Sequence, residues 1–486
     1  MYEYKERYFM RPTKSAFFPM DELPDCLLLR IFTHLNMTDL GRASRVCRKW
    51  KRITYDPSIW RSVNLERHAR AMDDKSFQLM VKSRLGPSLR HLNLSNCAVT
   101  SKMLRQLAKT CKSLHSVIFG KGSKLVNSGN DEVIFPPNLE LLELRPARGD
   151  FSFLKRIPRH FTKLKYLGIG SHSSKGPVPR MFVKMQNLTI LDCTNCEVMK
   201  DEHVQTISMC CPKLESFCLN GCKNIYGTTF EELLRRCTKL TTLLLRYTPI
   251  RDSCFDTELW SQTSLEEIDI SACTHLTRTG LIRLLTQIKT FRYLNLSYCG
   301  IGRAVTDSVL IAMTSYGSSA KIEMLDIRWS MNITPQVLRE FLKSCPKLKC
   351  LGIYQSSHIN CNAMAELLDC VPKLEILEFG AFGKASISES FLFPNLVQHC
   401  PHLKALSLIN FLSLNPYTDG QLFGRLLNGC SRLERINLCE PDPTLTSLIG
   451  SIRVTTTAKI TQRWQCVLPA PDVTLDAVMN EFSYLL

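Results

Sequence analysis

The residues of this chain best suited to chemistry are its 22 cysteines, because two pairs of them have the spacing of zinc ligands. Two residues separate Cys193 from Cys196, and three separate Cys218 from Cys222. A tetrahedral zinc site needs a second Cys or His pair, and none follows at matching spacing. Both pairs also fall at recurring positions of a repeated pattern. We therefore expect reduced thiols packed as small hydrophobic side chains, and no metal site.

Other catalytic motifs are missing from the sequence. It contains no glycine-rich phosphate-binding loop and no nucleophile motif. We therefore predict that the chain is not an enzyme, with no catalytic residue and no cofactor.

The charge and hydropathy patterns limit the classes of partner that the protein could bind. The net charge of +18 is compatible with nucleic acid, anionic lipid or an acidic protein. The basic residues are spread along the chain, and the densest group reads as a solvated helix face: Arg42, Arg45, Arg48, Lys49, Lys51 and Arg52. No nucleic-acid-binding motif accompanies it. Apolar runs never approach the 18 residues of a membrane span, and the N-terminus is charged where a signal peptide is apolar. We predict a cytoplasmic or nuclear protein that binds neither nucleic acid nor membrane.

A leucine pattern, L-x-x-L-x-L, organises most of the chain. We count about fourteen copies, at a period typical of leucine-rich repeats. Their first residues are Leu89, Leu114, Leu139, Leu164, Leu188, Leu214, Leu240, Leu265, Phe291, Ile322, Leu348, Leu374, Leu403 and Leu433. Positions within a copy are numbered below as places, starting from this first residue.

The repeats predict an α/β solenoid. Places 4 and 6 alternate as in a strand with one buried face, and helical stripes follow between copies. Leu281, Leu284, Leu285 and Ile288 make one such stripe. Thr229 with Glu232 forms a capping-box pattern, and Thr334 precedes a proline suited to a helix start. Parallel strands should therefore line the inside of a horseshoe over residues 67–440, with helices and loops outside.

A separate apolar helical segment precedes the repeats, from Leu23 to Trp60. Leu28, Ile31 and Leu35 share a helical face, and a second apolar run follows from Leu40 to Trp50. About forty residues bury too little surface to be stable alone, so an apolar face should meet a partner or the next domain. The plainer interpretation is that these helices only cap the repeats.

The full motif of this segment resembles the F-box, and repeats with Cys-Pro-x-Leu, as at Cys211-Pro212, resemble those of F-box/leucine-rich-repeat proteins. The resemblance implies a three-helix F-box over residues 20–66 that binds a Skp-family adaptor and, through it, cullin and RING subunits. The acidic residue usual two after the proline is Cys26 here. The implied adaptor-binding residues are Leu23, Pro24, Leu28, Ile31, Phe32, Leu35, Leu40, Val46, Cys47 and Trp50. Residues 1–19 are expected to form a mobile basic arm, and residues 441–486 a C-terminal cap.

The concave wall is the expected binding surface of a solenoid. Places 7 and 8 of the repeats from 240 to 348 gather arginine and aromatic side chains, which are enriched at binding hot spots. We predict that these residues bind a protein substrate: Arg246, Tyr247, Tyr298, Arg328, Trp329 and Tyr354. The alternative is that Arg328 pairs with Asp326 or its neighbours and that Trp329 folds into the loop above its strand.

The resulting functional hypothesis is a non-catalytic substrate receptor of an SCF-type ubiquitin ligase. The F-box would hold the adaptor, and the horseshoe would hold a protein substrate near the ubiquitin-charged enzyme. A rival hypothesis keeps the F-box and the adaptor but makes the horseshoe a scaffold or regulator without a ubiquitylated client.

Overall fold

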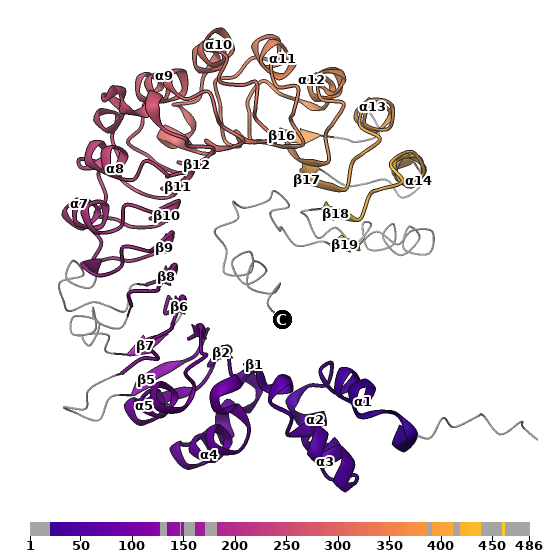
Figure 1. Ribbon diagram of the computed structural model, residues 1–486. Coiled ribbons are helices and arrows are strands. Elements are labelled where there is room, and N and C mark those ends of the chain that lie inside the picture. Colours follow the sequence, from indigo (N-terminus) through magenta and orange to yellow (C-terminus); the bar gives the residue numbers. More distant parts are fainter. Residues whose placement is uncertain are drawn as a thin grey trace, which may run out of the picture.

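A computed structural model describes residues 20–126, 134–145, 147–149, 161–170, 182–385, 391–411, 418–438 and 459–461. The chain forms a curved solenoid with strands on its inner wall and helices on its outer wall, and three short helices precede the first strand (Figure 1). The predicted α/β solenoid is confirmed. The N-terminal arm predicted over residues 1–19 lies outside the described residues, as does most of the predicted C-terminal cap.

The inner wall is one parallel sheet of sixteen described strands, in which each strand pairs with the next one of the wall along the chain. The register keeps equal places side by side, as in Thr242, Glu267 and Tyr293. The strands are β1 (Ser62–Asn64), β2 (His91–Asn93), β4 (Ser116–Ile118), β6 (Leu141–Glu143), β8 (Tyr166–Gly168), β9 (Ile190–Asp192), β10 (Ser216–Cys218), β11 (Thr242–Leu244), β12 (Glu267–Asp269), β13 (Tyr293–Asn295), β14 (Met324–Asp326), β15 (Cys350–Tyr354), β16 (Ile376–Ala385), β17 (Ala405–Phe411), β18 (Arg435–Leu438) and β19 (Lys459–Thr461).

The sheet extends beyond the predicted repeats at both ends. Strand β1 pairs with β2, although its residues fall in the segment predicted as F-box. Strand β19 pairs with β18, although its residues fall in the segment predicted to carry no repeat. Neither strand starts with an L-x-x-L-x-L unit, so the leucine count alone could not reveal them.

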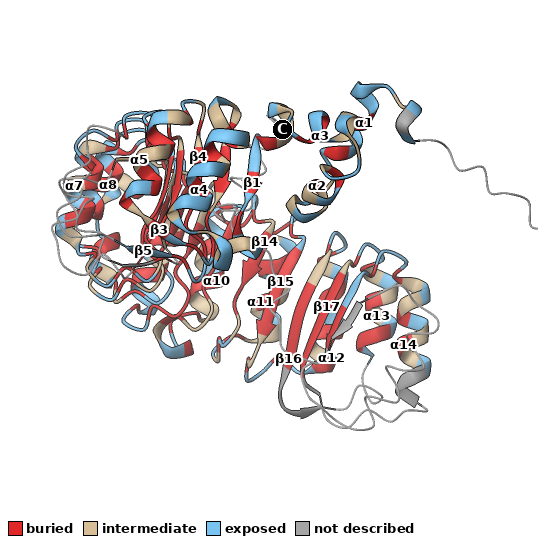
Figure 2. Ribbon diagram, turned by 90° about the horizontal axis from the view of Figure 1, so that it is seen from below, coloured by how far each residue is buried: buried red, intermediate tan, exposed pale blue. Residues whose placement is uncertain are grey.

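The outer wall carries one helix after most strands, and buried residues alternate with exposed ones along these helices (Figure 2). The stripe from Leu281 to Ile288 is buried, as predicted. Thr229 does not cap its helix, because its hydroxyl donates to the Asp201 carbonyl of the preceding repeat. The helices are α4 (Asp74–Met80), α5 (Ser101–Thr110), α7 (Asp201–Cys210), α8 (Phe230–Arg236), α9 (Arg278–Gln287), α10 (Asp307–Tyr316), α11 (Pro335–Lys343), α12 (Cys361–Leu367), α13 (Leu392–His399) and α14 (Thr418–Gly429).

Early in the array, a small second sheet is added to the outer wall. It consists of β3 (Ala98–Thr100), β5 (Lys124–Val126) and β7 (Arg148–Gly149), which pair in parallel. In the later repeats, a 3₁₀ turn such as Asp252–Phe255 takes part of the helix's place.

The repeat geometry accounts for the recurring positions of the cysteines. At place 9 the thiol donates to the place 6 carbonyl of the preceding repeat: the sulfur–oxygen distance is 3.1 Å from Cys222 to Cys193, 3.1 Å from Cys273 to Leu245 and 3.0 Å from Cys299 to Ile270. A small apolar side chain with one donor fits this narrow position. The cysteines of the described residues are free thiols, and no cluster of His, Cys, Asp and Glu among those residues could hold a metal.

Candidate functional site

The N-terminal module consists of α1 (Asp25–Phe32), α2 (Met37–Ala43) and α3 (Arg48–Thr54), packed around a small core. The rings of Phe32 and Trp50 meet edge to face with their centroids 5.1 Å apart. Leu28, Phe32 and Leu40 are at most 4% exposed. These three predicted adaptor-binding residues therefore support the helices and do not offer a surface to a partner.

The predicted helical face of Leu28, Ile31 and Leu35 is wrong in one respect. Helix α1 ends at Phe32, so its buried face consists of Leu28 and Phe32, four residues apart. Ile31 lies at the flank of that face and is 39% exposed, while Leu35 lies beyond the helix and is partly buried. The local run LLLRIF has apolar residues on both sides, and the sequence pattern does not say which side faces inward.

An exposed apolar set remains on the module, formed by Leu27, Ile31 and Val46. Leu27 and Ile31 lie one helical turn apart on α1, and Val46 lies in the turn before α3. They are 47%, 39% and 60% exposed. Pro24 beside them is exposed as well. Leu27 is not among the adaptor-binding residues predicted from the sequence. The sequence alone does not tell Leu27 from its neighbour Leu28, and only the structure shows that Leu28 is buried and Leu27 is exposed.

The other predicted residues of the module fill intermediate positions. Leu23, Leu35 and Trp50 are partly buried against the core. Cys47 precedes α3, and its sulfur accepts the backbone N–H of Trp50 at 3.4 Å.

Asp25 supplies the charge that Cys26 lacks. Its carboxylate pairs with Arg52 and lies 3.8 Å from the Lys49 ammonium, whose Nζ also donates to the Leu23 carbonyl at 2.7 Å. These contacts join the start of α1 to α3. They are solvent-exposed and contribute about 1 kcal/mol at most each.

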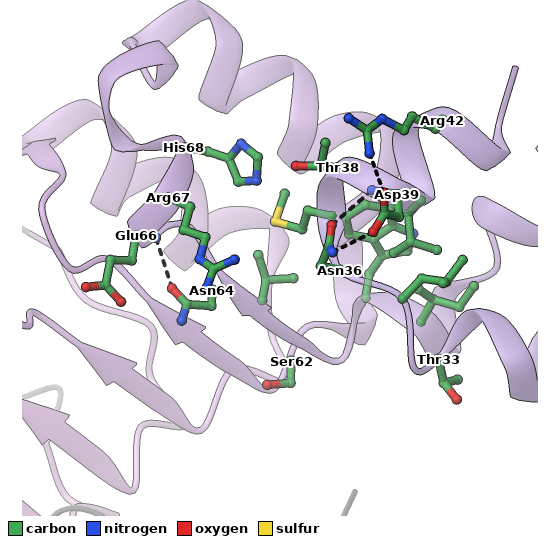
Figure 3. A pocket seen from close by; sticks show the side chains of 16 residues that line it. Thr33, Asn36, Thr38, Asp39, Arg42, Ser62, Asn64, Glu66, Arg67 and His68 are labelled. Carbon is green, nitrogen blue, oxygen red and sulfur yellow. Dashed lines mark hydrogen bonds and ion pairs between the residues drawn. The ribbon is translucent and has the colours of Figure 1, made fainter. Parts of the chain in front are cut away.

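The module is joined to the horseshoe through Trp60. This side chain is buried, its indole N–H donates to the Thr54 carbonyl at 2.9 Å, and the Arg84 guanidinium stacks 5.0 Å from its ring centroid. A polar groove of about 660 Å³ runs along the same junction, between α2 and the turn at Glu66–Ala71 (Figure 3). In it the Asn36 side chain accepts the Asp39 N–H, and the Asn64 side chain accepts the Glu66 N–H.

The acidic side chains of the concave wall accept hydrogen bonds from backbone N–H groups. Place 5 is the last residue of the three-residue strands, and where it is Asp, Glu or Asn its side-chain oxygen accepts the N–H two residues later, as at Asn93, Asp192, Asp269 and Asp326. For Asp269 the acceptor distances are 2.9 Å to the Ser271 nitrogen and 2.5 Å to the Ser271 hydroxyl. Asn93 makes the same turn with Ser95. Burial raises the pKa of Asp269 to about 6, against the lowering effect of these hydrogen bonds.

Arg328 is enclosed by carboxylates. Its Nε and Nη2 donate to the two oxygens of Asp326 at 2.8 and 2.6 Å, and its Nη1 pairs with Glu378 two repeats later. The Arg328 side chain is 12% exposed and both carboxylates are 0% exposed. Gly352 stands between them in the register and leaves the path open. The alternative foreseen for Arg328 is therefore correct, and its predicted contact with a substrate is not supported.

The same arrangement occurs earlier in the array. Arg145 pairs with Glu143 at 2.7 Å and with Asp192 two repeats later, across Gly168. A Cβ at Gly168 would lie 2.4 Å from a Glu143 carboxylate oxygen, so a side chain there would displace that carboxylate. Two separate clamps of the same design indicate a structural device of the wall.

The predicted aromatic residues do come together. The ring centroids are 6.0 Å apart for Tyr298 and Trp329 and 5.3 Å apart for Trp329 and Tyr354, both edge to face. Tyr247 is 60% exposed, and the Arg246 guanidinium lies 5.3 Å from its ring centroid. Trp329 folds against its neighbours, yet it stays 38% exposed. No described helix is long and apolar enough to cross a membrane.

Known proteins share both parts of this design. Residues 20–66 match the F-box-like family. The chain is 24% identical over 261 residues to F-box protein SKIP19 of Arabidopsis thaliana, which covers 51% of this chain and 83% of that protein. Human F-box/LRR-repeat protein 12 is 26% identical over 228 residues, covering 46% of this chain and 62% of that protein. The bovine protein of the same name is 24% identical over 341 residues, covering 68% and 86%.

Two solved structures resemble the fold at low identity. A chain in the crystal structure of the yeast Rad7 and Elc1 complex has a TM-score of 0.46 and 18% identity, covering 85% of this chain and 88% of that chain. An LRR protein of Leptospira interrogans has a TM-score of 0.44 and 15% identity, covering 83% and 96%. The chain therefore has an F-box-like segment ahead of leucine-rich repeats, and part of its length is similar to F-box/LRR-repeat proteins.

Proposed function

We propose that this protein is the substrate-recognition subunit of an SCF-type ubiquitin ligase. The F-box module would bind a Skp-family adaptor, and through it cullin and RING subunits, while the horseshoe binds a protein client. The observation that carries the proposal is the exposed apolar set of Leu27, Ile31 and Val46 on a module fixed to a repeat array. Exposed apolar side chains on a small module are typical of a docking surface.

The proposed mechanism is proximity without chemistry in this chain. One hydrophobic core runs from Leu28 in the F-box module to Ile436 in β18, so the module and the repeats form a continuous body. A client held on the repeats would keep a defined position relative to the adaptor. Its lysines would then meet the ubiquitin-charged enzyme at a high effective concentration.

The adaptor surface can be tested without damaging the fold, because its proposed residues are exposed. Leu27→Asp with Ile31→Asp should weaken adaptor binding by roughly 2 kcal/mol or more, about thirtyfold, since two apolar contacts are lost and two charges are buried. The matched control is Leu79→Asp on α4, where the leucine is 68% exposed and far along the chain from the module. Adaptor co-purification and calorimetric titration measure the effect. Equal recovery of adaptor from the double variant and the control would show that this surface does not dock the adaptor.

The client role is tested by ubiquitin-site proteomes of cells with and without the protein. Sites that disappear on depletion should return with the wild-type chain and stay absent with the Leu27→Asp, Ile31→Asp variant. If adaptor binding is intact and no ubiquitin site changes, the horseshoe is a scaffold or regulator instead.

A further inference from the structure

Place 8 of the repeat has an unusual backbone conformation that recurs along the array. Its φ lies between 55° and 72° at Asn96, Asn195, Gly221, Tyr247, Ala272, Tyr298, Trp329 and Gln355. In this left-handed conformation the N–H of place 8 continues the strand ladder, donating to the place 7 carbonyl of the next repeat. The nitrogen–oxygen distance is 3.0 Å from Tyr247 to Ser271 and 3.0 Å from Tyr298 to Arg328. The fold therefore imposes this conformation on whichever residue stands there.

The residue types at place 8 differ between the two parts of the array. Asn and Gly adopt positive φ most readily, and they occupy the earlier copies Asn96, Asn195 and Gly221. Tyr247, Tyr298 and Trp329 are bulky residues in the same conformation. Nearby Ile301 is β-branched at a φ of 59° and is 52% exposed. Tyr247, Trp329 and Ile301 are exposed, and large apolar groups held in strained backbone and left in water do not stabilise the fold. Such strain concentrates at functional sites.

These residues form a surface that we call the aromatic rim: Tyr226, Tyr247, Tyr298, Ile301 and Trp329. All follow the ends of strands between β10 and β14, on the upper left of the arc (Figure 1). Because adjacent strands are about 4.8 Å apart, place 8 of successive repeats forms a column of Tyr247, Ala272, Tyr298 and Trp329, while Tyr226 and Ile301 lie further along the loops that follow the strands. An extended peptide crossing the strands would meet several of these rings in turn.

Arginines accompany the rim without carboxylate partners. The Arg246 guanidinium stacks on Tyr247, and the Arg251 guanidinium lies 5.9 Å from the Tyr226 ring centroid. Arg303 is exposed beside Ile301. Within the described residues, none of these three arginines has a carboxylate oxygen within 4.0 Å. All three arginines are exposed, and Arg246 is close enough to Asp269 of the next repeat to lower the pKa of that carboxyl group.

The acidic residues of the same loops are already engaged. Asp201 accepts the N–H groups of Tyr226 and Gly227 at 3.2 and 3.1 Å. Asp252 accepts the Thr277 N–H at 2.9 Å, and Asp307 accepts the Thr334 N–H at 2.8 Å. Each aspartate therefore fixes the segment that precedes the helix of the next repeat, whereas the exposed arginines make no ion pair among the described residues and can donate to a partner.

We infer that the aromatic rim, with Arg246, Arg251 and Arg303, binds an extended client segment rich in Asp and Glu that carries an aromatic or large aliphatic side chain. The inference rests on the proposed function and names the class of substrate. The apolar side chain packs on the exposed rings, and the carboxylates accept from the guanidinium groups. This site shares Arg246, Tyr247, Tyr298 and Trp329 with the site predicted from the sequence. It excludes Arg328 and Tyr354, and it lies at the edge of the wall.

The first test uses peptide display against the full chain bound to its adaptor. Random 12-residue peptides should be enriched for Asp and Glu flanking an aromatic or large aliphatic residue. The affinity of an enriched, fluorescein-labelled peptide should fall about tenfold or more with Arg246→Glu, Arg251→Glu and Arg303→Glu combined, and should weaken as salt rises. The control variant makes the same charge change at exposed lysines away from the rim, with Lys109→Glu, Lys239→Glu and Lys347→Glu, and should bind as the wild type does.

A second variant separates binding from folding. Tyr247→Asn installs the residue that stands at place 8 in Asn96 and Asn195, where it fits the positive φ. The variant should melt at the same temperature as the wild type or higher, while its peptide affinity falls severalfold or more. A structural role for Tyr247 would instead lower the melting temperature.

Several results would overturn the inference. These are no enriched peptide, enriched peptides that are neutral or basic, equal loss of binding in the lysine control, and binding that requires a phosphorylated residue in the peptide. The proposed function is judged separately, by ubiquitin sites in cells. If the arginine variant still restores the sites that the Leu27→Asp, Ile31→Asp variant does not, the receptor role stands and the rim is not its client site.

Discussion

Replacing Arg328 with alanine should destabilise the horseshoe itself. Three of its N–H groups donate to Asp326 and Glu378, whose carboxylates are fully buried. Removing the guanidinium leaves two buried negative charges without their counter-ion. Breaking a buried pair in this way costs about 3–5 kcal/mol, which is a large part of the stability of an ordinary domain.

The assay must resolve local unfolding, because a repeat array does not unfold as one unit. Thermal and urea unfolding followed by circular dichroism gives the overall midpoint, and amide hydrogen exchange locates the loss. We expect faster exchange in β14 to β16 in Arg328→Ala. The control is Arg246→Ala at the same place of an earlier repeat, where the arginine is exposed and the change should stay within about 0.5 kcal/mol.

A compensated variant sharpens the test. Arg328→Met combined with Asp326→Asn and Glu378→Gln removes the cation and both charges together, and should recover most of the stability. If Arg328→Ala unfolds at the wild-type midpoint with unchanged exchange but loses its client, then Arg328 contacts the client as the sequence suggested. The clamp would then have little energetic weight.

Three further predictions follow from buried groups. Burial raises the pKa of Asp269 from 3.8 to about 6, so the folded state binds this proton more tightly than the unfolded state, and the stability that the proton adds below about pH 4 is lost as pH rises through 6. Asp269→Asn should therefore raise the melting temperature more at pH 7.5 than at pH 4. An equal change at the two pH values would contradict this. Burial raises the pKa of Cys222 to about 12, so mass spectrometry should find it unalkylated at pH 8 until the chain is denatured, whereas exposed Cys26 reacts at once. Gly168→Ala should cost about 1–3 kcal/mol in urea unfolding by displacing the Glu143 carboxylate, whereas Gly41→Ala, with nothing within 4 Å, should be harmless.

The sequence predicts those parts of the fold that depend on local period. Leucines at places 4 and 6 give the strands, and the stripe beginning at Leu281 gives a helix, because both patterns follow from which side of one element is buried. The same reasoning failed on α1, where apolar residues lie on both sides of the helix. Only the packing of Phe32 against Trp50 decides that Leu28 faces inward and Leu27 outward.

The candidate site was harder to predict because its residues interact across repeats. Arg328 and Glu378 are fifty residues apart, and their pairing needs the register of three strands and the gap left by Gly352. Their residue types alone suggest a binding surface and a buried clamp equally well. The positive φ of Tyr247 also could not be predicted from the sequence, because tyrosine rarely adopts that conformation.

The two walls of the horseshoe differ in the spacing between neighbouring elements, and this difference determines the curvature of the array. Strands are spaced by about 4.8 Å, whereas packed helices need about 8–10 Å between axes, so each repeat must turn by roughly 20° when the walls are about 10 Å apart. That rotation implies an inner radius of roughly 14 Å and carries the array through most of a circle, as Figure 1 shows from β1 to β18. A folded domain of about 100 residues has a radius of gyration near 13 Å and an outer radius larger than that. By this estimate the interior is wide enough for a loop or a tail and too narrow for a folded domain, so a client of the proposed kind would enter it only with an extended segment.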